Sequence, residues 1–169
     1  RFGYDAIQFP RIFDRVWQGT ETRDPATLDY GFVEQYQAYV NFRWMRACAG
    51  DKLEGAWFDY LDCDEQLFYE QAVTTHLGAP SRVIVFCYNE PLISGSMLNR
   101  VLDAKPVLNT LCAIAESPVG VNVVKPPHAD GGKDLFLFDY LGMLGIPCVP
   151  VTHIEHTMRS VIVSGHATR

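Results

Sequence analysis

The chain alternates between short apolar runs of strand length and longer stretches with helical periodicity. Between Gly31 and Ala49, apolar side chains recur every three or four residues, which predicts one face of a helix. Residues 82–88 are apolar almost throughout, which is typical of a strand buried on both faces in a parallel sheet. Further strands are predicted over residues 15–22, 55–61, 119–124, 148–151 and 160–164, and further helices over 65–77, 97–115 and 135–144.

Short polar side chains and prolines indicate where these elements end. Asp62 or Asp64 is placed to cap the helix that follows. Pro106 predicts a kink or a split in helix 97–115, and residues 130–132 predict a loop. The last helix carries an apolar stripe that is predicted to pack in the core, formed by Phe136, Phe138, Tyr140, Leu141 and Leu144.

The order of elements predicts an α/β protein with mainly parallel sheets. Residues 1–117 have the pattern of the last three β/α units of a TIM-type barrel. Residues 118–169 have that of the start of a flavodoxin-like parallel sheet domain, with the boundary near Ser117-Pro118. Both ends look cut, so a fragment of a longer protein is expected. Open edge strands predict that the isolated chain aggregates.

Composition narrows the classes of function. Fourteen Lys and Arg against twenty Asp and Glu give the 169-residue chain a net charge of -6, which argues against nucleic acid and anionic membranes as partners. The five cysteines form no C-x-x-C pair, so free thiols in a reducing, cytoplasmic setting are expected. His153-x-x-His156 lacks a third ligand and G-x-G-x-x-G is absent, so neither a metal nor a nucleotide cofactor is predicted.

Carboxylates follow all three strands of the first part, where parallel α/β proteins place their reactive groups. The catalytic candidates are Glu21, Asp59, Asp62 and Glu90. Two carboxylates across a cleft are what glycoside hydrolysis requires, because one protonates the leaving oxygen while the other attacks or activates water. The candidates for substrate binding, as charged, polar or flat aromatic side chains nearby, are Arg23, Trp17, Trp57, Tyr60, Tyr88 and Asn89.

Asp and Glu at a strand-to-helix turn also have a simpler interpretation, since they cap helices and favour their first turns. Asp62 and Asp64 fit that role. Glu21 fits it less well because Asp24-Pro25 follows and no helix begins at the next residue. Glu90 precedes Pro91 and is open to a surface-loop interpretation, while Asp59 lies inside its strand and needs a partner or a wet cleft.

Several sequence runs resemble a known pair of domains. Residues 123–132 (VVKPPHADGG) and 138–150 (FDYLGMLGIPCVP) resemble the start of the glutamine-amidotransferase-like domain behind the barrel of some glycoside hydrolases. The trimerisation domain of β-galactosidases is its best-known relative. Residues 16–25 (VWQGTETRDP) and 55–62 (GAWFDYLD) resemble the barrel of the same glycosidase-like proteins.

The resemblance implies a (β/α)8 barrel that acts on carbohydrate and a flavodoxin-like module that serves packing or homo-oligomerisation. It also implies that Glu21 is the nearest match to a catalytic carboxylate. The primary hypothesis is therefore a glycoside hydrolase with Glu21 and one of Asp59, Asp62 or Glu90 as the acid and nucleophile. The alternative is a non-catalytic carbohydrate-binding or oligomerisation module, in which the carboxylates are caps. A flavodoxin-like protein that binds a small cofactor is a third option, and the missing glycine-rich fingerprint counts against it.

Overall fold

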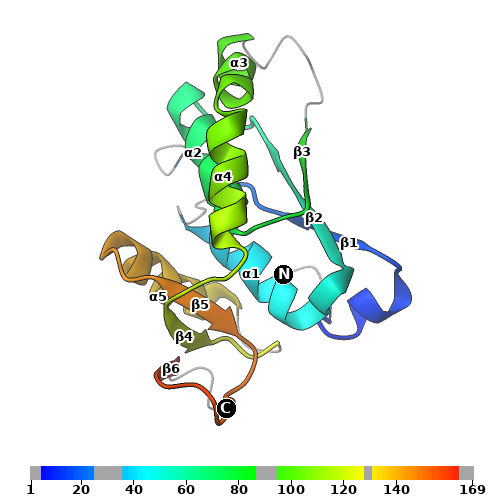
Figure 1. Cartoon of the computed structure of the whole chain (residues 1–169), viewed down its shortest axis with the longest axis vertical. Helices are drawn as coiled ribbons and strands as arrows, with labels where there is room; N and C mark the ends of the chain where they lie inside the picture. The colour runs from blue at the N-terminus through cyan, green and yellow to red at the C-terminus, as the bar shows by residue number, and fades with distance from the viewer. Residues whose placement is uncertain (1–4, 25–35, 87–94, 128–130, 164–169) are drawn as a thin grey trace.

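The computed structural model describes residues 5–24, 36–86, 95–127 and 131–163, which form two parallel three-stranded sheets with helices against them (Figure 1). The elements of the first part are η1 (Phe9–Ile12), β1 (Val16–Gly19), α1 (Gln37–Ala49), η2 (Gly50–Lys52), β2 (Leu53–Asp59), α2 (Glu65–Leu77), β3 (Arg82–Phe86), α3 (Gly95–Asp103) and α4 (Lys105–Ala115). Those of the second part are β4 (Val121–Val124), α5 (Gly131–Met143), β5 (Cys148–Val151) and β6 (Val161–Val163).

The first sheet has the strand order β1-β2-β3, as successive right-handed β/α units require. Successive side chains of each strand point to opposite faces of the sheet. On the face toward the helices, Phe58 packs against Phe68 and Ala72 of α2. A second cluster joins Val16, Phe42, Leu53 and Ala56 beneath α1. Gly19, Trp57 and Ile84 stand side by side on the opposite face of the sheet.

The second sheet has the strand order β5-β4-β6, so the strand that comes first in the chain lies in the middle. This second-first-third order is the one that opens a flavodoxin-like doubly wound sheet. Helix α5 covers it through Phe138 and Leu141, which are packed with Val123 and Cys148.

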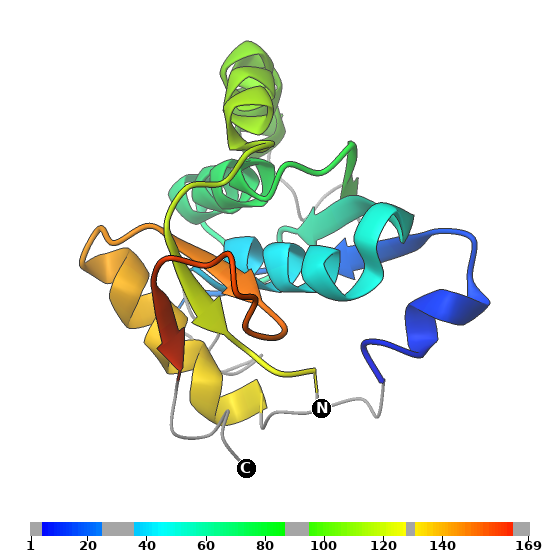
Figure 2. The same ribbon diagram turned by 60° about the horizontal axis from the view of Figure 1, so that its bottom comes forward.

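Helix α1 connects the cores of the two sheets. Phe42 faces the first sheet, whereas Val40 is buried with Val123 and Cys148 of the second. The Tyr39 hydroxyl donates to the carbonyl oxygen of Cys148 at 2.8 Å, and the Trp44 indole nitrogen donates to the carbonyl of Lys125 at 2.8 Å. Figures 1 and 2 show α1 between the two sheets. The two predicted domains therefore share one helix.

Most predicted elements are confirmed within one to three residues where the structure describes them. Helix 97–115 is split into α3 and α4 at Ala104, and Pro106 stands in the first turn of α4, where its missing N–H costs nothing. Asp64 caps α2, because its carboxylate accepts from the Leu67 backbone N–H at 2.7 Å. The predicted loop over 130–132 is wrong in part, since α5 already includes Gly131 and Gly132.

Two predictions of burial are wrong. Strand β3 is not buried on both faces, because helices cover only one side and Ile84 (47% exposed) and Phe86 (39%) lie on the other. The predicted core stripe of α5 is buried only at Phe138 and Leu141, whereas Tyr140 and Leu144 are exposed. The Phe136 side chain lies outside the described part. Of the cysteines described, Cys48, Cys63, Cys112 and Cys148 are free.

Candidate active site

Buried polar side chains gather where β1 and β2 end. Most of the buried polar residues that the structure describes lie at this one edge, and they are Thr20, Thr22, Arg23, Asp59, Gln71 and Thr75. Polar groups withdrawn from water need partners inside the protein, so this cluster is held together by a network of hydrogen bonds. The cluster occupies the carboxyl edge of the first sheet, where parallel α/β proteins place their chemistry.

The segment after β1 continues alongside β2 for a few residues. The Thr20 backbone N–H donates to the carbonyl of Trp57 at 2.9 Å, as in a parallel ladder, and the Thr20 hydroxyl lies 2.8 Å from that of Thr75 on α2. Asp24 is fixed in turn by its own N–H, which donates to the carbonyl of Asp62 at 3.1 Å. Hydrogen bonds therefore fix the backbone of residues 20–24. Glu21 and Arg23 are two residues apart in this segment.

Arg23 and Asp59 form a buried, bidentate ion pair. Arg23 Nη1 lies 2.9 Å from Asp59 Oδ1, and Nη2 donates to Oδ2 at 3.1 Å. Asp59 Oδ1 also accepts from the Leu61 backbone N–H at 3.1 Å, and Arg23 donates to the carbonyl of Thr22 at 2.9 Å. Paired, hydrogen-bonded geometry of this kind is what makes burial of two charges tolerable. Of the two alternatives that the sequence leaves for Asp59, a partner or a wet cleft, the structure has the partner, Arg23.

Glu21 lies beside this pair on the sheet face away from the helices. A Cβ on Gly19 would collide with Glu21 Oε2 and would stand 3.0 Å from the Trp57 ring, so the carboxyl folds back over Gly19 next to that indole. Burial raises the pKa of Glu21, and the charge of Asp59 raises it further. The Glu21 backbone N–H and the charge of Arg23 oppose the rise. A glutamate in this setting keeps its proton to a higher pH than usual, as a general acid must.

Asp62 is not a helix cap, although the sequence is compatible with that role. Asp62 has a φ of 52°, a left-handed conformation that Asp adopts more readily than most residues, and its Oδ2 is buried without a hydrogen-bond partner. Asp64 is the cap instead. The turn that carries Asp62 also brings the Cys63 thiol beneath the cluster, where burial raises its pKa to about 12. A buried thiol with a raised pKa is typical of a packing role.

The aromatic candidates divide between the two faces of the sheet. Trp57 is half-buried near Glu21, and its ring centroid lies 5.8 Å from that of Phe86. Trp17 occupies the same face one step earlier, over Gly55, where any Cβ would strike its ring. Tyr60 is buried on the helix side with Phe58 and Phe68, which favours packing over sugar binding. Tyr88, Asn89 and Glu90 lie outside the described residues.

Sequence analysis missed Gln71, whose amide is hydrogen-bonded to both Thr22 and Asp59. Gln71 falls on the same face of α2 as the buried Phe68, Ala72 and Thr75, and a glutamine on an apolar helix face is a signal that it has an internal partner. That signal was present in the sequence, whereas the identity of the partners was not.

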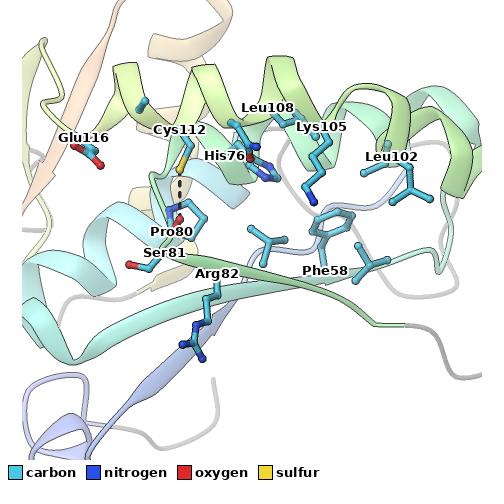
Figure 3. Close-up of a pocket in the computed structure, with 15 residues that line it drawn as sticks. Phe58, His76, Pro80, Ser81, Arg82, Leu102, Lys105, Leu108, Cys112 and Glu116 are labelled. Atoms are coloured by element: carbon cyan, nitrogen blue, oxygen red, sulfur yellow. Dashed lines mark hydrogen bonds between the residues drawn. The ribbon is translucent and has the colours of Figure 1, made fainter.

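A cavity of about 560 Å³ lies elsewhere, between β3 and α4 (Figure 3). Its wall includes Phe58, Leu108 and Lys105, and the Cys112 thiol donates to the carbonyl of Pro80 at 3.3 Å beside it. Burial lowers the pKa of His76, which also lines it. None of the described carboxylate candidates faces this cavity, because it opens on the helix side of the sheet.

Among the described residues, no group of three or more His, Cys, Asp or Glu side chains is arranged to hold a metal ion. No helix in those same ranges has the length and the apolar surface to cross a bilayer.

Comparison with known proteins places the same segment in a family. Residues 1–103 match the family described as "Probable glycosyl hydrolase, catalytic domain", and this match covers more than half of the chain and contains the whole polar cluster. No curated protein and no solved structure matches the chain significantly. The substrate class that a glycosyl hydrolase domain implies is carbohydrate. The chain therefore belongs to the probable glycosyl hydrolase catalytic domain family, with that domain in its N-terminal part.

Proposed function

We propose that the chain hydrolyses glycosidic bonds with Glu21 as the general acid. The observation that carries this proposal is the setting of Glu21. Its carboxyl has a raised pKa and lies two residues after the end of β1, a parallel strand in a glycosyl hydrolase domain. Burial of this kind is how glycosidases keep one carboxyl protonated near neutral pH while a second one stays charged.

Asp59 supplies the second carboxylate of the proposed mechanism. Its charge contributes to the raised pKa of Glu21, and its three hydrogen bonds from Arg23 and Leu61 hold it in one orientation. A fixed negative charge at this place favours the positive charge that develops on the sugar ring in the transition state. Trp57, half-buried beside Glu21, offers a flat apolar face to the sugar.

The test is hydrolysis of a panel of 4-nitrophenyl glycosides by the purified chain, followed by release of 4-nitrophenol. We expect Glu21→Gln to lower kcat by roughly 100-fold or more, since general acid catalysis contributes about 10²–10⁴-fold. The wild-type rate should fall as pH rises through the raised pKa of Glu21, because the proton to be donated is then lost.

The matched control is Glu65→Gln, which neutralises an exposed carboxylate in the first turn of α2, paired with Arg100 at 3.6 Å. This variant should keep wild-type rates. A Glu21→Gln protein that folds and retains more than half of the activity would refute the assignment of Glu21.

For the second sheet we propose a flavodoxin-like, amidotransferase-like module that serves self-association. The support is its second-first-third strand order together with the apolar surface at the end of α5, where Tyr140 is 61% and Leu144 73% exposed. Apolar surface of this kind is more typical of an interface than of a face in contact with water. Sedimentation velocity, which reports the oligomeric state directly, is the measurement that decides it.

A further inference from the structure

The Gln71 side chain stands where the next hydrogen bond between β1 and β2 would form. Thr20 N–H donates to Trp57 O, so a regular parallel ladder would continue with Thr22 N–H donating to Asp59 O two residues later. The structure has the Gln71 amide in between. Its Oε1 accepts from Thr22 N–H at 2.9 Å, and its Nε2 donates to Asp59 O at 2.8 Å.

An inserted amide of this kind separates the two strands. One direct N–H···O bond spans about 2.9 Å, whereas two such bonds in series with a side-chain amide between them span considerably more. The carboxyl ends of β1 and β2 are therefore held apart at the level of Thr22 and Asp59, and every backbone group there remains satisfied. Gln71 is only 1% exposed, so water cannot take its place without a rearrangement of α2.

The separation sets the geometry of the candidate active site. Glu21 and Arg23 flank Thr22 in the chain, and Asp59 is the residue whose carbonyl the amide holds. Any movement of Thr22 toward β2 would carry Glu21 and Arg23 with it and would change their approach to the Asp59 carboxylate. Errors of about 1 Å in such arrangements cost an enzyme up to 10²-fold in rate.

We propose that Gln71 is a positioning residue, an amide wedge from α2 that holds Glu21 and Arg23 at their working distance from Asp59. This inference rests on the proposed glycoside hydrolase function, which it extends to a residue with no direct role in the chemistry. Glutamine suits the position because one side of its amide accepts and the other donates, as the Thr22 N–H and the Asp59 carbonyl require.

Two substitutions separate positioning from simple stability. Gln71→Met keeps the shape and removes the hydrogen bonds of the amide to Thr22 and Asp59, together with the longer one of 3.5 Å to the Cys63 thiol, so Thr22 N–H and Asp59 O are expected to close directly on each other. We expect kcat to fall roughly 10–100-fold with KM within about threefold, because the wedge acts on geometry and not on substrate binding. The midpoint of the Glu21 titration, followed by NMR of its carboxyl carbon, should move away from its wild-type value, because closure changes the distances from Glu21 to the charges of Asp59 and Arg23.

Gln71→Glu provides a readout that a purely structural role would not move. The introduced carboxyl accepts from Thr22 N–H at every pH, but it donates to Asp59 O only when protonated. The ratio of the variant rate to the wild-type rate should therefore rise as pH falls through the titration of that carboxyl. A ratio that is flat with pH, together with a kcat within twofold of wild type, would overturn the proposal.

Gln66→Met is the matched control, since Gln66 lies on the same helix and is exposed, and its side chain bonds to Glu70 and Arg100 among the described residues. It should leave the rate and the Glu21 titration unchanged.

The NMR readout separates the proposed glycoside hydrolase function from the proposed role of Gln71. If the wild-type chain hydrolyses no glycoside, the proposed function fails, and a Glu21 midpoint that moves in Gln71→Met still supports the wedge. A midpoint that stays in place in folded Gln71→Met refutes the wedge even in an active enzyme.

Discussion

The two sheets have the same number of strands and the same parallel architecture, yet they differ at their carboxyl edges. The first sheet ends in a buried cluster of carboxylate, guanidinium, amide and hydroxyl groups around Asp59 and Gln71. At the second, the described residues include one buried charge, Lys125, whose ammonium lies 5.2 Å from the centroid of the Trp44 ring, and no buried carboxylate. The family match covers only the first sheet.

This difference separates what the architecture provides from what the residues provide. A parallel sheet gives an edge at which loops converge, and both sheets have one. Chemistry requires in addition that polar groups be buried in fixed relation to one another, at a cost in stability that the surrounding packing offsets. Only the first sheet carries such groups among its described residues, so we expect substitutions to affect the two regions differently.

The largest effect is expected at the ion pair of the first sheet. Arg23→Met leaves the Asp59 carboxylate buried without its partner and should lower the free energy of unfolding by about 3–5 kcal/mol in urea titrations. The contrasting variant is Arg82→Met, which removes the exposed pair between Arg82 and Glu54 at 3.2 Å and should cost about 0–1 kcal/mol. Equal effects of the two substitutions would contradict the view that burial makes the first pair special.

A smaller effect is expected where the two regions meet. Val40→Ala removes two methyl groups from the core of the second sheet, although Val40 belongs to the family-matched segment. We expect a loss of about 1–3 kcal/mol from lost transfer energy and the cavity that remains. Amide hydrogen exchange should show weaker protection in β4 and β5. If exchange changed only in the first sheet, α1 would not couple the two cores as described.

The smallest effect on stability is expected just after the end of α5. Leu144→Glu alters an exposed side chain and should change the free energy of unfolding by less than about 0.5 kcal/mol. It should nevertheless shift the chain toward monomer in sedimentation velocity if this face mediates self-association. A wild-type chain that sediments as a monomer at all concentrations would refute the proposed role of the second sheet in self-association.

The order of elements, the split at Ala104 and the cap at Asp64 were predictable because they depend on local periodicity and on side chains near in sequence. The exposure of Ile84 and Phe86 was not, since an apolar strand looks the same whether one face or both are covered. The same limit applied to α5. Its sequence shows an apolar stripe, while the packing partners that bury Phe138 and leave Leu144 exposed come from distant segments.

The site was predictable in its residue types and less so in its arrangement. Glu21, Arg23 and Asp59 were candidates because polar residues at strand ends are unusual in a core pattern. The ion pair between Arg23 and Asp59 spans 36 positions, and the Gln71 bond to Thr22 spans 49. Such pairings depend on strand register, which neither composition nor spacing encodes.

The sharing of α1 between both cores has a consequence for synthesis on the ribosome. Tyr39 and its partner Cys148 are 109 residues apart, so α1 emerges long before the sheet that covers its outer side. At about 5–20 residues per second, Val40 and Tyr39 wait roughly 5–20 s without their partners. During that interval the apolar face of α1 has no partner from the second sheet, and slower translation between residues 50 and 148 would lengthen the exposure.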